Sequence, residues 1–287
     1  MMTFKAILIG SLGTYLLATT AFTGQAQNVS LQKKWESEAN LLTCESVLHD
    51  ASKKMIYVSN INGEPGAKDG NGSIGRVTLA GKVENAEWVK GLDAPKGLGL
   101  YRDKLYVADL TKVVVIDTKT GQKLKDIEVT GAEFLNDVTV DSKGQVYVSD
   151  SNTGTVFRIT NDKSEVWLKN SSLKRLNGLL AYQNKIYLID MNDGSFYQVN
   201  ETDKSLVKKA EGLKGGDGIV PVGKDEFLVS NWNGEVHYVS SNGQTQKLLD
   251  TKAEKLNAAD IEYIPAQNLL LIPTFFGNKI MAYQLKK

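Results

Sequence analysis

Residues 136–150 read NDVTVDSKGQVYVSD: a polar residue, a short alternating segment, a Ser-Lys-Gly turn and a second segment ending in Ser-Asp. Alternation of apolar and polar residues over a few positions is typical of a β-strand with one covered face. Asp, Ser and Gly between two such segments indicate a tight connection. The stretch therefore predicts two antiparallel strands joined by a turn.

The same pattern occurs five more times along the chain. The other copies are ESVLHDASKKMIYVSN (45–60), KGLGLYRDKLYVAD (96–109), NGLLAYQNKIYLID (177–190), DGIVPVGKDEFLVSN (217–231) and DIEYIPAQNLLLIPT (260–274). Their first residues are between 40 and 51 positions apart, which is close to the repeat of a four-stranded propeller blade. Six copies predict an all-β fold, a single six-bladed β-propeller.

The outer half of each blade is supplied by further short strands between the copies, such as 154–159 and 234–239. Residues 29–38 have strand character but no blade of their own, whereas the last copy is followed by one more strand at 279–285. We expect the N-terminal strand to complete the last blade, because this closes the ring and leaves no free sheet edge at the junction.

The N-terminal segment has the pattern of a secretory signal. Lys5 precedes an apolar run, residues 6–22, and a small-residue stretch follows at 24–26. We expect residues 1–26 to be a signal peptide and residues 27–287 to form the propeller, with no membrane span after cleavage. An uncleaved anchor is the alternative. Export places the protein in the periplasm or outside the cell.

Composition narrows the chemistry. Lys+Arg 34 against Asp+Glu 33 gives a net charge of +1, and no basic cluster is evident, so nucleic acid is not an expected partner. One cysteine and two histidines cannot build a Cys/His zinc site. Any metal must be held by oxygen. Cys44 is expected to be a small buried hydrophobe.

In a propeller the first strand of each blade lines the central channel, so the residues that open the six copies should surround one mouth. All six are polar: Glu45, Lys96, Asn136, Asn177, Asp217 and Asp260. Crowded carboxylates and amides are stabilised by a hard cation such as Ca²⁺, which prefers oxygen ligands. Two alternatives stay open. Each residue could simply cap a turn, or the Lys96 ammonium could neutralise Glu45 or Asp260 without any metal.

A second polar ring is predicted at the same mouth, where the second strands end. Its members are Asn60, Asp109, Asp150, Asp190, Asn231 and Thr274. Trp232, Phe275 and Phe276 follow on the same rim. We interpret Lys96, Asp109, Asp150, Trp232 and Phe275 as candidates for binding a small molecule; ordinary packing between blades is the alternative for the aromatic residues.

These segments together resemble the six-bladed propellers of the senescence marker protein, gluconolactonase and luciferin-regenerating enzyme family. The resemblance covers essentially the whole chain after the signal. It implies one divalent cation, Ca²⁺ first, with Mg²⁺, Mn²⁺ or Zn²⁺ as alternatives. The family's glutamate matches Glu45 in CESVLHD, its asparagines match Asn136 in LNDV and Asn177 in LNGL, and its aspartate matches Asp217 in GDGI.

The resemblance implies hydrolysis of a small ester, a lactone first, by a monomeric enzyme. The catalytic candidates are Asp217 as general base and Glu45 as the alternative base, with Asp137 and Asp260 supporting the ligands. Two features depart from this pattern. Lys96 lies in the channel, and the histidine pair of the paraoxonases, which the chain resembles more distantly, has no counterpart. They favour the alternative, a non-catalytic propeller that binds a small ligand or a protein, with a structural metal or none.

Overall fold

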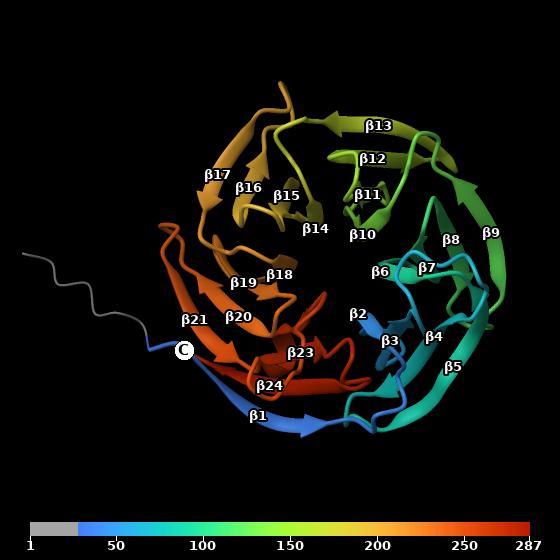
Figure 1. The fold of residues 1–287 in the computed structure, drawn as a ribbon, viewed down its shortest axis with the longest axis horizontal. Helices are drawn as coiled ribbons and strands as arrows, with labels where there is room; N and C mark the ends of the chain where they lie inside the picture. Colours follow the sequence, from blue (N-terminus) through green and yellow to red (C-terminus); the bar gives the residue numbers. More distant parts are fainter. Residues whose placement is uncertain (1–27) are drawn as a thin grey trace, which may run out of the picture.

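The computed structural model describes residues 28–287, and the predicted signal peptide lies outside them. Six antiparallel sheets of four strands each are arranged in a ring (Figure 1). This confirms the predicted six-bladed propeller. Within residues 28–287 no helix is long and apolar enough to cross a membrane.

Each blade consists of four strands ordered from the centre of the ring outward. The first three are β2 (Cys44–Asp50), β3 (Met55–Asn60), β4 (Gly72–Thr78), β5 (Val83–Leu92); β6 (Pro95–Tyr101), β7 (Lys104–Asp109), β8 (Lys112–Asp117), β9 (Lys123–Glu128); and β10 (Leu135–Val140), β11 (Val146–Asp150), β12 (Thr155–Thr160), β13 (Lys163–Lys169). The last three are β14 (Leu176–Tyr182), β15 (Lys185–Asp190), β16 (Ser195–Val199), β17 (Leu206–Ala210); β18 (Gly216–Gly223), β19 (Glu226–Asn231), β20 (Glu235–Val239), β21 (Thr245–Asp250); and β22 (Glu262–Ile264), β23 (Leu269–Pro273), β24 (Ile280–Lys286), β1 (Ser30–Glu36).

The ring closes as the sequence predicts. The N-terminal strand β1 pairs antiparallel with β24, with Ser30 opposite Lys286 and Glu36 opposite Met281. In Figure 1 the blue strand lies beside the red one, so the two ends of the chain share the sixth blade. Hydrogen bonding between chain ends fixes the first blade against the last and removes an open edge.

The hydrophobic core lies between the blades. Each of six large apolar clusters is made by two neighbouring blades. Adjacent residues of a strand point to opposite faces, so Val148 of β11 packs against blade two while Tyr147 packs against blade four. Because both faces of a blade are covered, second strands such as β3 are buried at every position.

Candidate functional site

The polar residues that open the repeats lie at one recurring irregularity. In the first five blades the inner strand carries one extra residue relative to the second strand: Leu135 pairs with Asp150 and Val138 with Val148, for example. Asn136 and Asp137 both lie opposite Ser149. Such a bulge bends the strand and redirects side chains, and here it directs the first bulge residue of each blade toward the channel mouth.

A serine on the second strand stabilises the bulge in three blades. The Oγ atoms of Ser59, Ser149 and Ser230 accept the backbone N–H of Ser46, Asp137 and Gly218 at 2.8–2.9 Å. The bulge leaves these N–H groups without a strand partner, and a buried donor without a partner is costly. The Ser-Asp and Ser-Asn endings of the repeats thus have a local structural role.

The redirected side chains meet in a cavity of about 740 Å³. Five of the six predicted ring residues line it: Glu45, Lys96, Asn136, Asn177 and Asp217. The remaining lining residues come from the loops at the same mouth and include Pro65, Phe134, Arg175, Met191, Lys214, Trp232, Glu235, Lys252, Phe275 and Phe276. The volume is in the range of small-molecule sites.

Three oxygen atoms in this cavity are buried and accept no hydrogen bond. They are Oε2 of Glu45, Oδ1 of Asn177 and Oδ1 of Asp217. The three side chains are only 2–5% exposed. Buried acceptors without a donor are rare in folded proteins and costly. Three together, in residues from three different blades, point to a positively charged or donating ligand between them.

The electrostatics of the two carboxyl groups agree with this. Burial raises the pKa of Glu45 well above its usual value, and the charges of Asp217 and Asp260 raise it further. Burial is also the main cause that raises the pKa of Asp217, followed by the charge of Asp260. Mutual repulsion in a dry site disfavours both anions, and a bound cation would reverse that effect.

The two asparagines leave their carbonyl oxygens available. Nδ2 of Asn136 donates to Ser151 Oγ at 3.1 Å, and Nδ2 of Asn177 lies 3.9 Å from the sulfur of Met191. The donor set is therefore two carboxylates and two amide oxygens, which suits Ca²⁺ or a similar hard cation. No group of three or more His, Cys, Asp and Glu side chains that could hold a metal occurs in residues 28–287, so the candidate centre depends on the amides.

Lys96 does not form the predicted ion network in the part of the chain that the structure describes. Its ammonium group donates to the carbonyl oxygens of Pro65 (2.8 Å) and Ala94 (3.0 Å) and lies 4.4 Å from the ring centroid of Phe134. Burial lowers its pKa to about 8, against the opposing effect of Glu45. The lysine is 2% exposed, and its bonds to carbonyls leave Glu45 Oε2 without a partner.

Asp260 departs from the predicted ring. The inner strand of blade six begins only at Glu262, and Asp260 instead forms a parallel bridge with Ser46. Its N–H donates to the carbonyl oxygen of Glu45 at 3.0 Å, and its carboxylate accepts from Ser46 Oγ at 2.5 Å. The Asp260 side chain therefore lines a separate hollow further along the inner strands. Burial raises its pKa to about 7.

Asp137 lines the same hollow as Asp260. Its carboxylate accepts hydrogen bonds from the N–H groups of Val138 and Leu179. Leu179 lies two residues after Asn177 in β14, so this bond links blade three to the inner strand of blade four. Asp137 and Asp260 thus bind the inner strands that carry Asn177 and Glu45 through backbone groups and Ser46, and their role in supporting the metal ligands stays a prediction.

Asp109 and Asp150, predicted to bind substrate, are absent from the cavity lining. Asp109 accepts the N–H groups of Asp93 and Ala94. Asp150 accepts those of Glu133 and Phe134 and of two residues in the turn that follows it. Both carboxylates are fully buried. They brace the loops that enter the inner strands, so the structure gives them a structural role in place of the predicted one.

The aromatic residues of the rim do reach the cavity. Trp232, Phe275 and Phe276 lie edge to face, with ring centroids 4.8–6.0 Å apart. Phe275 is buried, whereas Phe276 is 62% exposed. They form an apolar wall at the mouth. Phe275 packs in a buried cluster and also lines the cavity, and its contact with a ligand stays a prediction.

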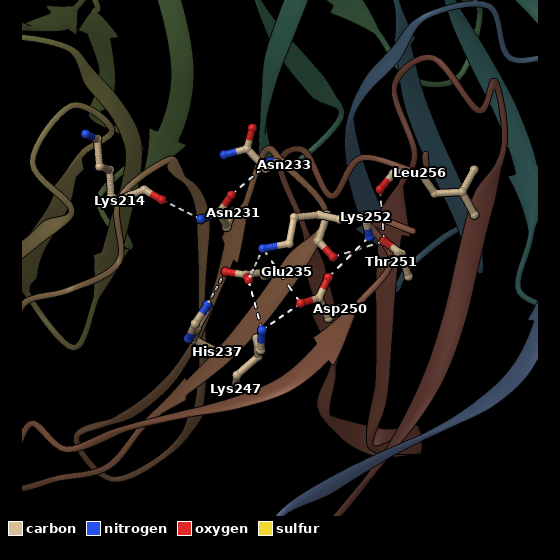
Figure 2. A network of polar contacts seen from close by, with 11 residues as sticks. Lys214, Asn231, Asn233, Glu235, His237, Lys247, Asp250, Thr251, Lys252 and Leu256 are labelled. Carbon is tan, nitrogen blue, oxygen red and sulfur yellow. Dashed lines mark hydrogen bonds and ion pairs between the residues drawn. The ribbon is translucent and has the colours of Figure 1, made fainter. Parts of the chain in front are cut away.

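A polar network on blade five contributes Glu235 and Lys252 to the cavity lining (Figure 2). Glu235 contacts His237 Nε2 at 2.9 Å and accepts from Lys247 and Lys252. These hydrogen bonds lower the pKa of Glu235 to about 2 against the effect of burial. In contrast to Glu45 and Asp217, this carboxylate of the cavity is already satisfied by protein groups.

Phe134 and Arg175 line the cavity but were not among the predicted site residues. Each lies one residue before an inner strand, β10 or β14, and two residues before Asn136 or Asn177. Their equivalent positions at the entry to two repeats are the signal that could have found them.

Comparison with family models and with curated proteins finds no match. Solved structures share the fold. A streptogramin B lyase has a TM-score of 0.66 at 9% identity, over 90% of this chain and 98% of that chain. A catalytically inactive virginiamycin B lyase from Staphylococcus aureus with quinupristin has a TM-score of 0.64 at 12% identity, over 90% of this chain and 100% of that chain. A chain of a nidogen/laminin complex has a TM-score of 0.58 at 19% identity, over 69% of this chain and 75% of that chain. These proteins are similar in fold, as six-bladed propellers.

Proposed function

We propose that this protein is an exported, metal-dependent hydrolase of a small ester, with a lactone as the preferred substrate. The observation that carries the proposal is the set of three buried oxygens without donors, on Glu45, Asn177 and Asp217, at one cavity. The resemblance of the repeat openings to the gluconolactonase family supports it, because the Glu, Asn, Asn and Asp residues occur in the family's order on the inner strands of blades one, three, four and five.

Glu45, Asn136, Asn177 and Asp217 would hold the cation. All four offer oxygen, so Ca²⁺ is the first candidate, with Mg²⁺, Mn²⁺ and Zn²⁺ as alternatives. When bound, the ion would polarise an ester carbonyl and stabilise the negative charge that develops on its oxygen.

Asp217 is the candidate general base. One of its carboxylate oxygens would bind the cation while the other accepts a proton. Asp217 would take a proton from water as the water oxygen bonds to the carbonyl carbon, and the ester C–O bond then breaks with the proton passing to the leaving oxygen. Glu45 is the alternative base, since it is the second carboxylate of the proposed ligand set and lines the same cavity. Lys96 and the aromatic wall would orient the substrate.

The test is turnover of a panel of lactones by the calcium-loaded protein. We expect activity that is lost with chelator, is restored by Ca²⁺, and falls at least about 100-fold in Asp217→Asn, as for other groups placed to transfer protons. Glu235→Gln is the matched control, because it removes one charge from the same cavity at a carboxylate that protein groups already satisfy. Equal turnover by Asp217→Asn and wild type would exclude Asp217 as the base.

The second candidate is a non-catalytic propeller that binds a small ligand or a protein. Two observations favour it: Lys96 brings a cation close to the proposed metal, and His237 is held by Glu235 on blade five. The solved neighbours include both a lyase and a chain from a complex of two proteins, so the fold permits either function. Cation binding without turnover of any lactone would support this candidate.

A further inference from the structure

Two cationic side chains at the cavity mouth form no ion pair within residues 28–287, although the charge of Arg175 acts on Asp217. Arg175 and Lys214 are exposed and line the cavity, and within residues 28–287 neither has a carboxylate oxygen within 4.0 Å among the ion pairs of the structure. The other two lining cations differ. Lys252 pairs with Glu235, and Lys96 donates to backbone carbonyls.

The backbones of the two residues are held in place. The N–H of Arg175 donates to Asp190, and its carbonyl oxygen accepts from Met191 N–H at 2.9 Å. The carbonyl oxygen of Lys214 accepts from the side chain of Asn231, as Figure 2 shows. Asp190 and Asn231, two residues of the second polar ring, thus fix the loops that carry Arg175 and Lys214. Loops fixed before a ligand arrives are the preorganisation expected of a binding site.

The same loops connect the cations to the aromatic wall. Met191 N–H bonds to Arg175, the carbonyl oxygen of Met191 accepts from Gly215 N–H at 2.8 Å, and that of Gly215 accepts from Trp232 N–H at 2.9 Å. Trp232 in turn packs edge to face on Phe276 at 6.0 Å. A continuous set of backbone bonds therefore places charged and apolar groups at one mouth.

The charge balance of the cavity favours an anion. Its lining includes the cations Lys96, Arg175, Lys214 and Lys252 and the carboxylates Glu45, Asp217 and Glu235. A divalent cation on Glu45 and Asp217 would offset their two charges and leave an excess of positive charge facing the ligand. Phe276, 62% exposed beside two other rings, offers an apolar surface that a ligand would cover.

We infer that the cavity binds a small organic carboxylate that carries an apolar, preferably aryl, group. Arg175 and Lys214 bind the carboxylate, and Trp232 and Phe276 contact the apolar group. The inference rests on the proposed function for its site. It specifies that the ester substrate or its acid product is a monoanion with an apolar substituent, in contrast to an uncharged, hydroxylated sugar lactone.

The test is calorimetric titration of calcium-loaded protein with three probes: 4-phenylbutyrate, its neutral amide and butyrate. We expect the phenyl acid to bind about tenfold or more tightly than the amide, because hydrogen bonds between charged groups are stronger than neutral ones. It should also bind about tenfold more tightly than butyrate, which lacks the ring. Equal binding of acid and amide by wild type would overturn the inference.

Variants assign the two preferences to residues. Arg175→Gln with Lys214→Gln should bring the acid-to-amide ratio close to one while the affinity for the amide stays unchanged, which also shows that the variant is folded. Phe276→Ala should reduce the preference for phenylbutyrate over butyrate. Lys174→Gln is the matched control, since Lys174 is exposed on the same loop outside the cavity. An unchanged acid-to-amide ratio in the double variant would contradict the inference.

These outcomes separate the two proposals, because the probes are not substrates. Selective binding of the aryl carboxylate without turnover of any aryl-substituted lactone acid would confirm the ligand class and contradict the hydrolase. Turnover of a neutral sugar lactone as fast as that of an anionic aryl lactone would contradict the ligand class and support the hydrolase.

Discussion

Gly178 lies so close to Asp217 that a Cβ atom added to the glycine would be 1.9 Å from the Asp217 carbonyl oxygen. Gly178 follows the predicted ligand Asn177 in blade four. Asp217 is the predicted ligand of the neighbouring blade five. Gly97 and Gly218 occupy the equivalent bulge positions in blades two and five. A Cβ atom added to either would likewise meet backbone atoms of the next blade, at Asp137 and Ile261 respectively. Small residues beside the ligands thus allow the inner strands to converge on the channel.

Gly178→Ala should therefore destabilise the fold and disturb the site. A methyl group meeting backbone atoms forces blades four and five apart, and such overpacking costs about 1–3 kcal/mol or more. We expect a lower melting temperature and weaker cation binding. Gly66→Ala is the control, because its Cβ would meet only Phe134 at 3.9 Å. A Gly178→Ala protein as stable as Gly66→Ala would contradict the close approach.

Ser230→Ala tests the serine that stabilises the bulge. Ser230 Oγ accepts from Gly218 N–H at 2.8 Å and donates to Ala259 at 2.7 Å. Removing it leaves a buried N–H and a buried carbonyl without that partner, at a cost of about 1–3 kcal/mol. Denaturant unfolding should show this loss, whereas the exposed Ser142→Ala should change stability by less than about 0.5 kcal/mol. Equal stability of both variants would refute the capping role.

Asp150→Asn separates a structural role from substrate binding. The Asp150 carboxylate accepts four backbone N–H groups, and an amide can replace only part of that capacity. We predict a loss of about 1–3 kcal/mol in unfolding free energy. Asp162→Asn, at an exposed turn, serves as control. Weaker ligand binding with unchanged stability would instead restore the interpretation of Asp150 as a ligand contact.

Glu262 gives a pH dependence with a definite sign. It lines the second hollow, where burial, followed by the charge of Asp260, raises its pKa to about 8 from an ordinary 4.5. A carboxyl group with a raised pKa stabilises the folded state fully below pH 4.5, and this contribution is lost as the pH rises toward 8. Glu262→Gln should therefore gain melting temperature relative to wild type between pH 4.5 and 8, measured in chelator. A difference that does not change with pH would contradict the raised pKa.

The fold could be predicted from the sequence because each blade repeats a local pattern. The spacing of Glu45, Lys96, Asn136, Asn177 and Asp217 placed them at equivalent strand starts, and all five line the cavity. Their role as metal ligands stays a prediction. The N-terminal strand could be assigned to blade six because β24 otherwise had no outer neighbour.

The parts that could not be predicted depend on contacts between blades or loops. The position of Asp260 depends on its bonds to Glu45 and Ser46, more than 200 residues away in sequence. The role of Asp150 depends on loop N–H groups that turn toward its carboxylate. Neither arrangement leaves a pattern in residue type, since an aspartate at a strand end looks the same whether it binds a ligand or a loop.

The most direct test of the account is calorimetric titration of Ca²⁺ into chelator-stripped protein. We expect Ca²⁺ to bind at one site. The affinity should be at least about tenfold weaker in Glu45→Gln, since a carboxylate ligand becomes a neutral amide, and within about threefold of wild type in Glu235→Gln. Thermal unfolding should show matching stabilisation by the ion. No binding of Ca²⁺, Mg²⁺, Mn²⁺ or Zn²⁺ by wild type, or equal affinity in Glu45→Gln, would contradict a metal centre at the three buried oxygens.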